Sequence, residues 1–226
     1  MTVSAPTRAA VAWRRLDTAT GVAGLAAVVL IFVPIVVGTR AEPRFDAAAT
    51  EFLSYYQSPN TPAAPLRSFP FTIGLITFVW FVVALSTLLR RAEGAVPWRS
   101  TIAMVCGVLF VALVLSGSEV AAGLRADDLD PQIARYAFDE SQATFANARV
   151  ALGSFAGCCG WVLHTTRFLP RWLGWLAMAI GLGLVFSRIS WTSPIWLLPY
   201  LMFWLWVIIV AVLLLRRGLR GAAKSD

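Results

Sequence analysis

The sequence predicts an all-α membrane protein, with six transmembrane helices in one bundle and short amphipathic helices in the two long outer loops. Of its 226 residues, 58% are hydrophobic and only 14% are charged, whereas a water-soluble surface usually needs about a quarter charged residues. Six apolar runs approach the roughly 20 residues that cross a bilayer. Arginines gather in alternate loops. Because these loops are too short for a second core, we expect one polytopic domain, 1–226.

The predicted spans occupy, in order, residues 21–38, 69–89, 101–122, 145–164, 172–186 and 195–215. The fifth is the shortest. We retain it as a span because Trp172 and Trp175 at its start are amphipathic indoles, which favour membrane interfaces.

The fourth span carries a packing motif. Its small residues include Gly153-xxx-Gly157 and Ala156-xxx-Gly160, a spacing that lets helix backbones approach closely. We therefore expect this helix at the centre of the bundle, with the Gly157 face buried against another helix. Packing inside the chain is favoured, and contact with a partner helix or a second copy in a homo-oligomer is the alternative.

Both long outer loops contain a helix signal. Residues 45–57 place apolar side chains at helical spacing, which predicts a short helix on the outer surface. In the other loop, Asp130 followed by Pro131 is typical of a helix start. A helix running unbroken from there to Thr166 would be about 54 Å long, so it either projects beyond the membrane or bends near Ser141.

The distribution of basic residues predicts the orientation. Twelve arginines and lysines fall in the loops and termini on one side, against five on the other, and positive charge is retained on the cytoplasmic side. Both termini are therefore predicted to be cytoplasmic. Arginine outnumbers lysine 18 to 1, which suggests a high-GC bacterial genome and hence a bacterial plasma membrane. Because the basic charge is spread over several juxtamembrane pieces, we expect membrane lipids as partners and no nucleic acid.

Three charged residues form the candidate ligand-binding site. Glu119, Arg149 and Arg188 lie at one depth, near the outer ends of the third, fourth and fifth spans. Charges in that zone are unfavourable unless they are paired or reach water. Because sequential antiparallel helices are usually neighbours, we expect Glu119 to pair with one arginine and leave the other for an anion. The alternative is that each arginine reaches separately to the lipid headgroups.

The sequence predicts no cofactor, no metal site and no catalytic residues. A single histidine, His164, cannot supply bis-histidine haem or a histidine-rich di-iron site. The three cysteines all fall in spans and form no CxxC motif. Ser154 lies ten residues before His164, about 15 Å along one helix, which is too far for a catalytic pair.

These observations favour a non-enzymatic membrane protein that binds a lipid, a small amphipathic ligand or a partner helix at an outer-leaflet polar site. One alternative is a membrane-embedded enzyme acting on a lipidic or isoprenoid substrate, with Glu119 as acid or base. Another is a small secondary transporter, although the two halves show no convincing internal similarity.

The segment Arg167–Trp175, with the sequence RFLPRWLGW, resembles an inner-loop motif of a family of small six-helix actinobacterial integral membrane proteins of unknown function. The resemblance extends over most of the chain and includes an outer helix like FDAAATEFLSYYQ. It implies a fold and no catalytic or binding residue.

Overall fold

The computed structural model describes residues 8–37, 41–58, 65–190 and 193–222, and this part of the chain contains helices and no β-strand. The elements are α1 (Arg8–Val37), α2 (Ala49–Tyr56), α3 (Pro65–Glu93), α4 (Trp98–Leu115), α5 (Glu119–Leu124), α6 (Pro131–Thr166), α7 (Arg171–Phe186), a 3-10 turn (Pro194–Trp196) and α8 (Leu197–Ala222). The predicted all-α class is confirmed.

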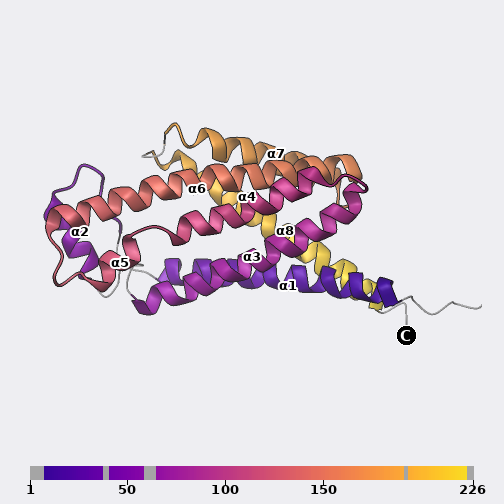
Figure 1. The fold of residues 1–226 in the computed structure, drawn as a ribbon, viewed down its shortest axis with the longest axis horizontal. Coiled ribbons are helices and arrows are strands. Elements are labelled where there is room, and N and C mark those ends of the chain that lie inside the picture. Colours follow the sequence, from indigo (N-terminus) through magenta and orange to yellow (C-terminus); the bar gives the residue numbers. More distant parts are fainter. Residues whose placement is uncertain (1–7, 38–40, 59–64, 191–192, 223–226) are drawn as a thin grey trace, which may run out of the picture.

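The long helices form two packed pairs that are joined by α4 and α8 (Figure 1). Helix α1 packs along α3 and α8, whereas α6 packs along α7 and α4. Helix α8 runs obliquely across the bundle, and buried aromatic side chains such as Phe78, Phe155 and Phe203 fill the space between the helices. We call the end where α1 begins and α8 ends the terminal end. The opposite end, which carries α2 and α5, is the α2 end.

Four segments are long and apolar enough to cross a membrane: 11–37, 68–93, 98–124 and 194–220. They support the prediction of a transmembrane helical protein, but the count of six spans is not confirmed. Helix α7 has only 16 residues. Helix α6 is long, but its central part contains glycines and polar residues, and much of its surface packs against other helices.

The bounds of two predicted spans differ from the structure. Helix α1 begins at Arg8 rather than at residue 21, while the predicted end of that span, Gly38, lies outside the described residues. The predicted third span, 101–122, is interrupted after Leu115, so Glu119 is the first residue of the short helix α5.

Side chains from α6 hold the interruption between α4 and α5. Glu140 Oε2 accepts hydrogen bonds from the Ser118 backbone N–H at 3.1 Å and from the Ser118 hydroxyl at 2.7 Å. The Ser141 hydroxyl accepts the backbone N–H of Glu119 at 3.0 Å. These two N–H groups are thereby satisfied without a continuous helix.

The Glu140 contacts make stability depend on pH. The hydrogen bonds from Ser118 hold the pKa of the Glu140 carboxyl below its usual range. A carboxyl whose folded-state pKa is lowered contributes stability that is complete above its unfolded pKa of about 4.3, and that is lost as pH falls through the folded-state pKa. We therefore expect the difference in melting temperature between wild type and Glu140→Gln to be largest near neutral pH and to shrink below about pH 4. Melting curves across this range test it. Asp127→Asn, at an exposed position, serves as control. A difference that stays constant down to pH 3 would contradict the prediction.

Helix α6 begins where the sequence predicts. Asp130 Oδ1 accepts the backbone N–H of Gln132 at 2.8 Å, with Pro131 at the first helical position. The helix continues for 36 residues without a break near Ser141, which corresponds to about 54 Å.

The first turns of α6 pack against α2 and α5 and enclose a small separate core. The buried side chains of this core include Phe52 and Tyr55 from α2 and Phe138 from α6. Helix α2 lies within the predicted range 45–57 but begins only at Ala49. Helices α2 and α5 are thus part of one packed unit with the first turns of α6 at the α2 end (Figure 1).

Glycines bring α6 and α7 into backbone contact. A Cβ added to Gly153 would lie 2.6 Å from the carbonyl oxygen of Gly181, and one added to Gly160 would lie 2.6 Å from that of Gly174. The predicted close packing of the fourth helix therefore occurs inside the chain. The Gly157 backbone also lies against α7, since a Cβ added to Gly181 would be 2.9 Å from the Gly157 nitrogen. A Cβ added to Gly157 itself meets nothing within 4 Å, so this position is not one where a side chain is excluded. The tight positions are seven residues apart, about two helical turns, and Gly157 lies beside that line.

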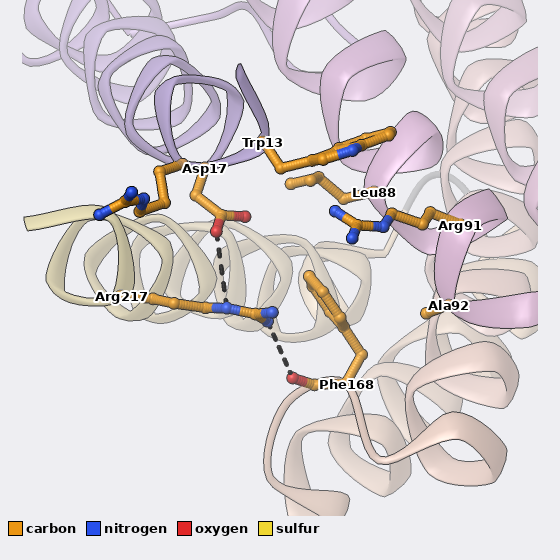
Figure 2. Close-up of a pocket in the computed structure, with 8 residues that line it drawn as sticks. Trp13, Asp17, Leu88, Arg91, Ala92, Phe168 and Arg217 are labelled. Atoms are coloured by element: carbon orange, nitrogen blue, oxygen red, sulfur yellow. Dashed lines mark hydrogen bonds and ion pairs between the residues drawn. The ribbon is translucent and has the colours of Figure 1, made fainter. Parts of the chain in front are cut away.

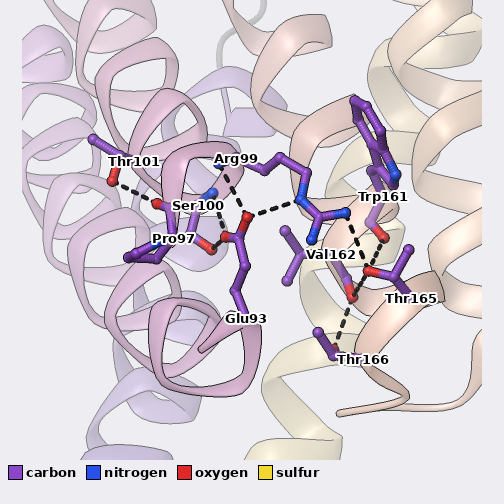
Figure 3. Close-up of polar contacts among 9 residues, drawn as sticks. All are labelled: Glu93, Pro97, Arg99, Ser100, Thr101, Trp161, Val162, Thr165 and Thr166. Atoms are coloured by element: carbon purple, nitrogen blue, oxygen red, sulfur yellow. Dashed lines mark hydrogen bonds and ion pairs between the residues drawn. The ribbon is translucent and has the colours of Figure 1, made fainter. Parts of the chain in front are cut away.

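At the terminal end, Glu93 joins α3 to α4 (Figure 3). Its carboxylate accepts hydrogen bonds from the backbone N–H groups of Arg99 and Ser100 and from both of their side chains. The Arg99 guanidinium also donates to the Thr165 hydroxyl at 3.3 Å and lies 5.2 Å from the centre of the Trp161 ring. The loop after α3 is thereby attached to the end of α6.

Candidate functional site

Arg149 occupies the middle of α6 and is one of the largest fully buried side chains, with 1% of its surface exposed. Its guanidinium carbon lies 4.5 Å from the centre of the Trp196 ring and 5.3 Å from that of Phe145. Its Nε is buried and has no hydrogen-bond partner. The interaction of the cation with the ring faces offsets part of the unfavourable desolvation.

Three aromatic rings form the wall around Arg149. Phe145 lies one turn before it on α6, while Trp196 and Tyr200 come from the start of α8 and the turn that precedes it. Their ring centres are 5.5 to 5.8 Å apart in edge-to-face arrangements, the geometry that aromatic pairs prefer. Sequence reasoning missed this cluster. The sequence signal for it is that residues 145 and 149, and residues 196 and 200, are four positions apart, a spacing that places two side chains on one face of a helix.

Arg188 follows the end of α7 and lies near Arg149. Its Nε donates to Asn147 Oδ1 at 2.9 Å, which holds the side chain against α6. Asn147 is two residues before Arg149 on α6, so Arg188 is attached to the same turn of that helix. The structure thus brings the two predicted arginines together, as like charges. Among the described residues neither forms an ion pair with an acidic side chain.

Glu119 does not join the arginines. Its carboxylate accepts a hydrogen bond from the Tyr55 hydroxyl at 3.4 Å, within the small core at the α2 end. The predicted ion pair with Arg149 or Arg188 is wrong. The physical reason is the interruption after α4, which places Glu119 on α5, against α2 and the first part of α6.

An apolar groove lies between α7 and α8. It has a volume of about 500 Å³ and is lined by side chains that include Ile180, Leu198 and Met202. Its lining also includes Ser187, which directly precedes Arg188, and Ser190, which follows it by two residues in the connection after α7. The groove therefore ends close to the chain segment that carries Arg188.

This arrangement suits an anion better than a cation or a metal. Two arginines without an acidic partner provide positive charge and N–H donors in a partly desolvated position. Within the described residues there is no cluster of three or more His, Cys, Asp or Glu side chains that could hold a metal ion.

In comparisons with known proteins, no protein-family model, curated protein or solved structure matches this sequence. The family resemblance of the Arg167–Trp175 segment stays a prediction.

Proposed function

We propose that this protein is a non-enzymatic membrane protein that binds an anionic amphipathic molecule, a lipid or a small lipid-like ligand, at Arg149 and Arg188. The observation that supports the proposal is the environment of Arg149. Its buried guanidinium lies against aromatic rings instead of a carboxylate, and a second arginine, Arg188, is bound to Asn147 on the same turn of α6. A buried charge without a counter-charge is unfavourable. A bound anionic headgroup would supply that counter-charge.

The groove between α7 and α8 supports an amphipathic ligand rather than a small soluble anion. Its side chains are mostly apolar, and it ends beside the segment that carries Arg188. An acyl or isoprenoid tail in this groove would place a negatively charged head close to the two arginines.

The proposal includes the finer topology. We infer six spans, with α6 and α7 crossing the bilayer as the fourth and fifth and with both termini in the cytoplasm. The arginine-rich composition supports the plasma membrane of a high-GC bacterium of the actinobacterial type. The asymmetry of twelve basic residues against five supports this orientation. In it, the α2 end and the two arginines belong to the outer half of the membrane.

The position of Glu119 favours binding over catalysis. A membrane-embedded enzyme acting on a lipidic or isoprenoid substrate, with Glu119 as its acid or base, would need this carboxylate beside the anion-binding arginines. Glu119 instead contacts Tyr55 in a separate cluster.

Lipid retention by arginine variants tests the proposal. The purified protein is offered phosphatidylglycerol or phosphatidylcholine with the same acyl chains, and retained lipid is counted by native mass spectrometry. We expect wild type to prefer phosphatidylglycerol, and Arg188→Gln to retain about tenfold less of it, because a hydrogen bond to a charged group is lost.

Arg125→Gln is the matched control, since Arg125 is an exposed arginine at the α2 end. It should bind phosphatidylglycerol like wild type. Arg149→Gln should also lose the lipid while remaining folded, because the substitution removes a buried charge that has no acidic partner. The proposal fails if wild type retains both lipids equally, or if Arg188→Gln and Arg125→Gln behave alike.

A further inference from the structure

A second polar pocket lies at the terminal end of the bundle, far along the helices from Arg149. It has a volume of about 490 Å³ and is enclosed by the start of α1, the end of α3, the end of α8 and the loop between α6 and α7 (Figure 2). The lining side chains that matter here are Trp13, Asp17, Arg91, Phe168 and Arg217.

Two arginines of this pocket rest on aromatic rings. The Arg91 guanidinium carbon lies 4.2 Å from the centre of the Trp13 ring, and that of Arg217 lies 4.4 Å from the centre of the Phe168 ring. Contact through the flat face of a guanidinium leaves the N–H groups in its plane free to donate. Arg217 directs its Nε to Asp17 and one Nη to the Phe168 carbonyl oxygen, each at 3.5 Å, so its other Nη is the donor that faces a ligand. Such a pair of fixed cations suits a phosphate group.

Asp17 brings a negative charge into this otherwise basic pocket. It is 5% exposed, and its Oδ2 pairs with Arg217 Nε at 3.5 Å. Its Oδ1 is buried and has no hydrogen-bond partner. Figure 2 shows this second oxygen directed toward the space between Trp13, Arg91 and Phe168. Because a buried acceptor without a donor is unfavourable by about 1 to 3 kcal/mol, the pocket calls for a hydrogen-bond donor as well as an anion.

We infer that this pocket binds the headgroup of a phospholipid that carries an N–H donor beside its phosphate, as phosphatidylethanolamine does. The phosphate lies against Arg91 and Arg217, and the ammonium group donates to Asp17 Oδ1. The pocket lies at the ends of three of the apolar segments, and its tryptophan belongs to the residue type that occupies the headgroup region. A lipid is therefore the source of the phosphate ester, rather than a soluble molecule.

The choice of lipids makes the test specific for the donor. Phosphatidylethanolamine and phosphatidylcholine share the phosphate, but the quaternary ammonium of choline has no N–H group. With equal acyl chains, we expect wild type to retain phosphatidylethanolamine about tenfold better than phosphatidylcholine in native mass spectrometry, as one charge-assisted hydrogen bond predicts.

Three variants separate the contributions. Asp17→Asn should lose the preference between the two lipids, because the carboxylate that receives the ammonium is gone. Arg91→Gln should weaken retention of both about equally. Arg90→Gln, an exposed arginine next in sequence whose side chain does not line the pocket, should behave like wild type. Arg91 is itself exposed, so this variant stays informative even if Asp17→Asn fails to fold.

Equal retention of the two lipids by wild type would overturn the inference, and so would identical behaviour of Arg91→Gln and Arg90→Gln. Displacement of the bound lipid by micromolar soluble phosphoethanolamine would overturn the assignment to a lipid. None of these results depends on Arg149 or Arg188, so this site and the proposed function at the other side of the bundle can fail separately.

Discussion

Gly160→Ala is expected to lower the free energy of unfolding by about 3 kcal/mol, as overpacking against atoms that cannot move aside does. The added Cβ would lie 2.6 Å from the carbonyl oxygen of Gly174 and 2.9 Å from the backbone nitrogen of Met178. Both are backbone atoms of α7, so the two helix backbones would have to move apart at this point.

Gly157→Ala is the matched control on the same helix. Its Cβ meets nothing within 4 Å, and alanine restricts the unfolded chain more than glycine does. We therefore expect no loss of stability and a gain of up to about 1 kcal/mol. Thermal or denaturant unfolding of the purified protein in one detergent compares the two variants. Equal effects of the two substitutions would show that the contact between α6 and α7 is not as close as described.

Glu93→Ala is expected to have a similarly large effect, about 3 kcal/mol of lost stability, because it removes one partner of a buried ion pair. The Glu93 side chain is 1% exposed, and its carboxylate lies 2.8 Å from Arg99 Nε. It also accepts the backbone N–H groups of Arg99 at 3.2 Å and of Ser100 at 3.0 Å. These two N–H groups belong to the first turn of α4, where no helical carbonyl can satisfy them.

The effect should be distinguishable from the loss of any surface charge. Glu51→Ala removes an exposed glutamate from α2 and should change stability by no more than about 0.5 kcal/mol. Glu93→Gln, which keeps the shape and one acceptor oxygen, should fall between the two. Unfolding measurements under the same conditions compare the stabilities of the three variants. A Glu93→Ala variant as stable as Glu51→Ala would show that the Glu93 contacts do not stabilise the fold.

Features that depend on neighbouring residues could be read from the sequence. The apolar runs predict long helices, and the Asp130-Pro131 pair predicts where α6 begins, because an N-cap acid and a proline act within a single turn. The stripe in residues 45–57 predicts α2 for the same reason. Local patterns also identified the fourth helix as one that packs closely, since small side chains remove the obstacle to contact whatever the partner is.

What the tertiary structure decided is which groups meet. The sequence placed Glu119 beside the arginines by depth, yet contacts with Glu140 and Ser141, more than twenty residues away, end the helix before Glu119 and turn it toward Tyr55. In the same way, the rotation of α6 against α7 selects Gly153 and Gly160 over Gly157. The terminal pocket joins residues from positions 13 to 217. The position of a residue along one helix determines on which face and at which depth its side chain lies. Which residue it contacts depends also on how the neighbouring helices are rotated and where they end, and packing between distant segments sets both.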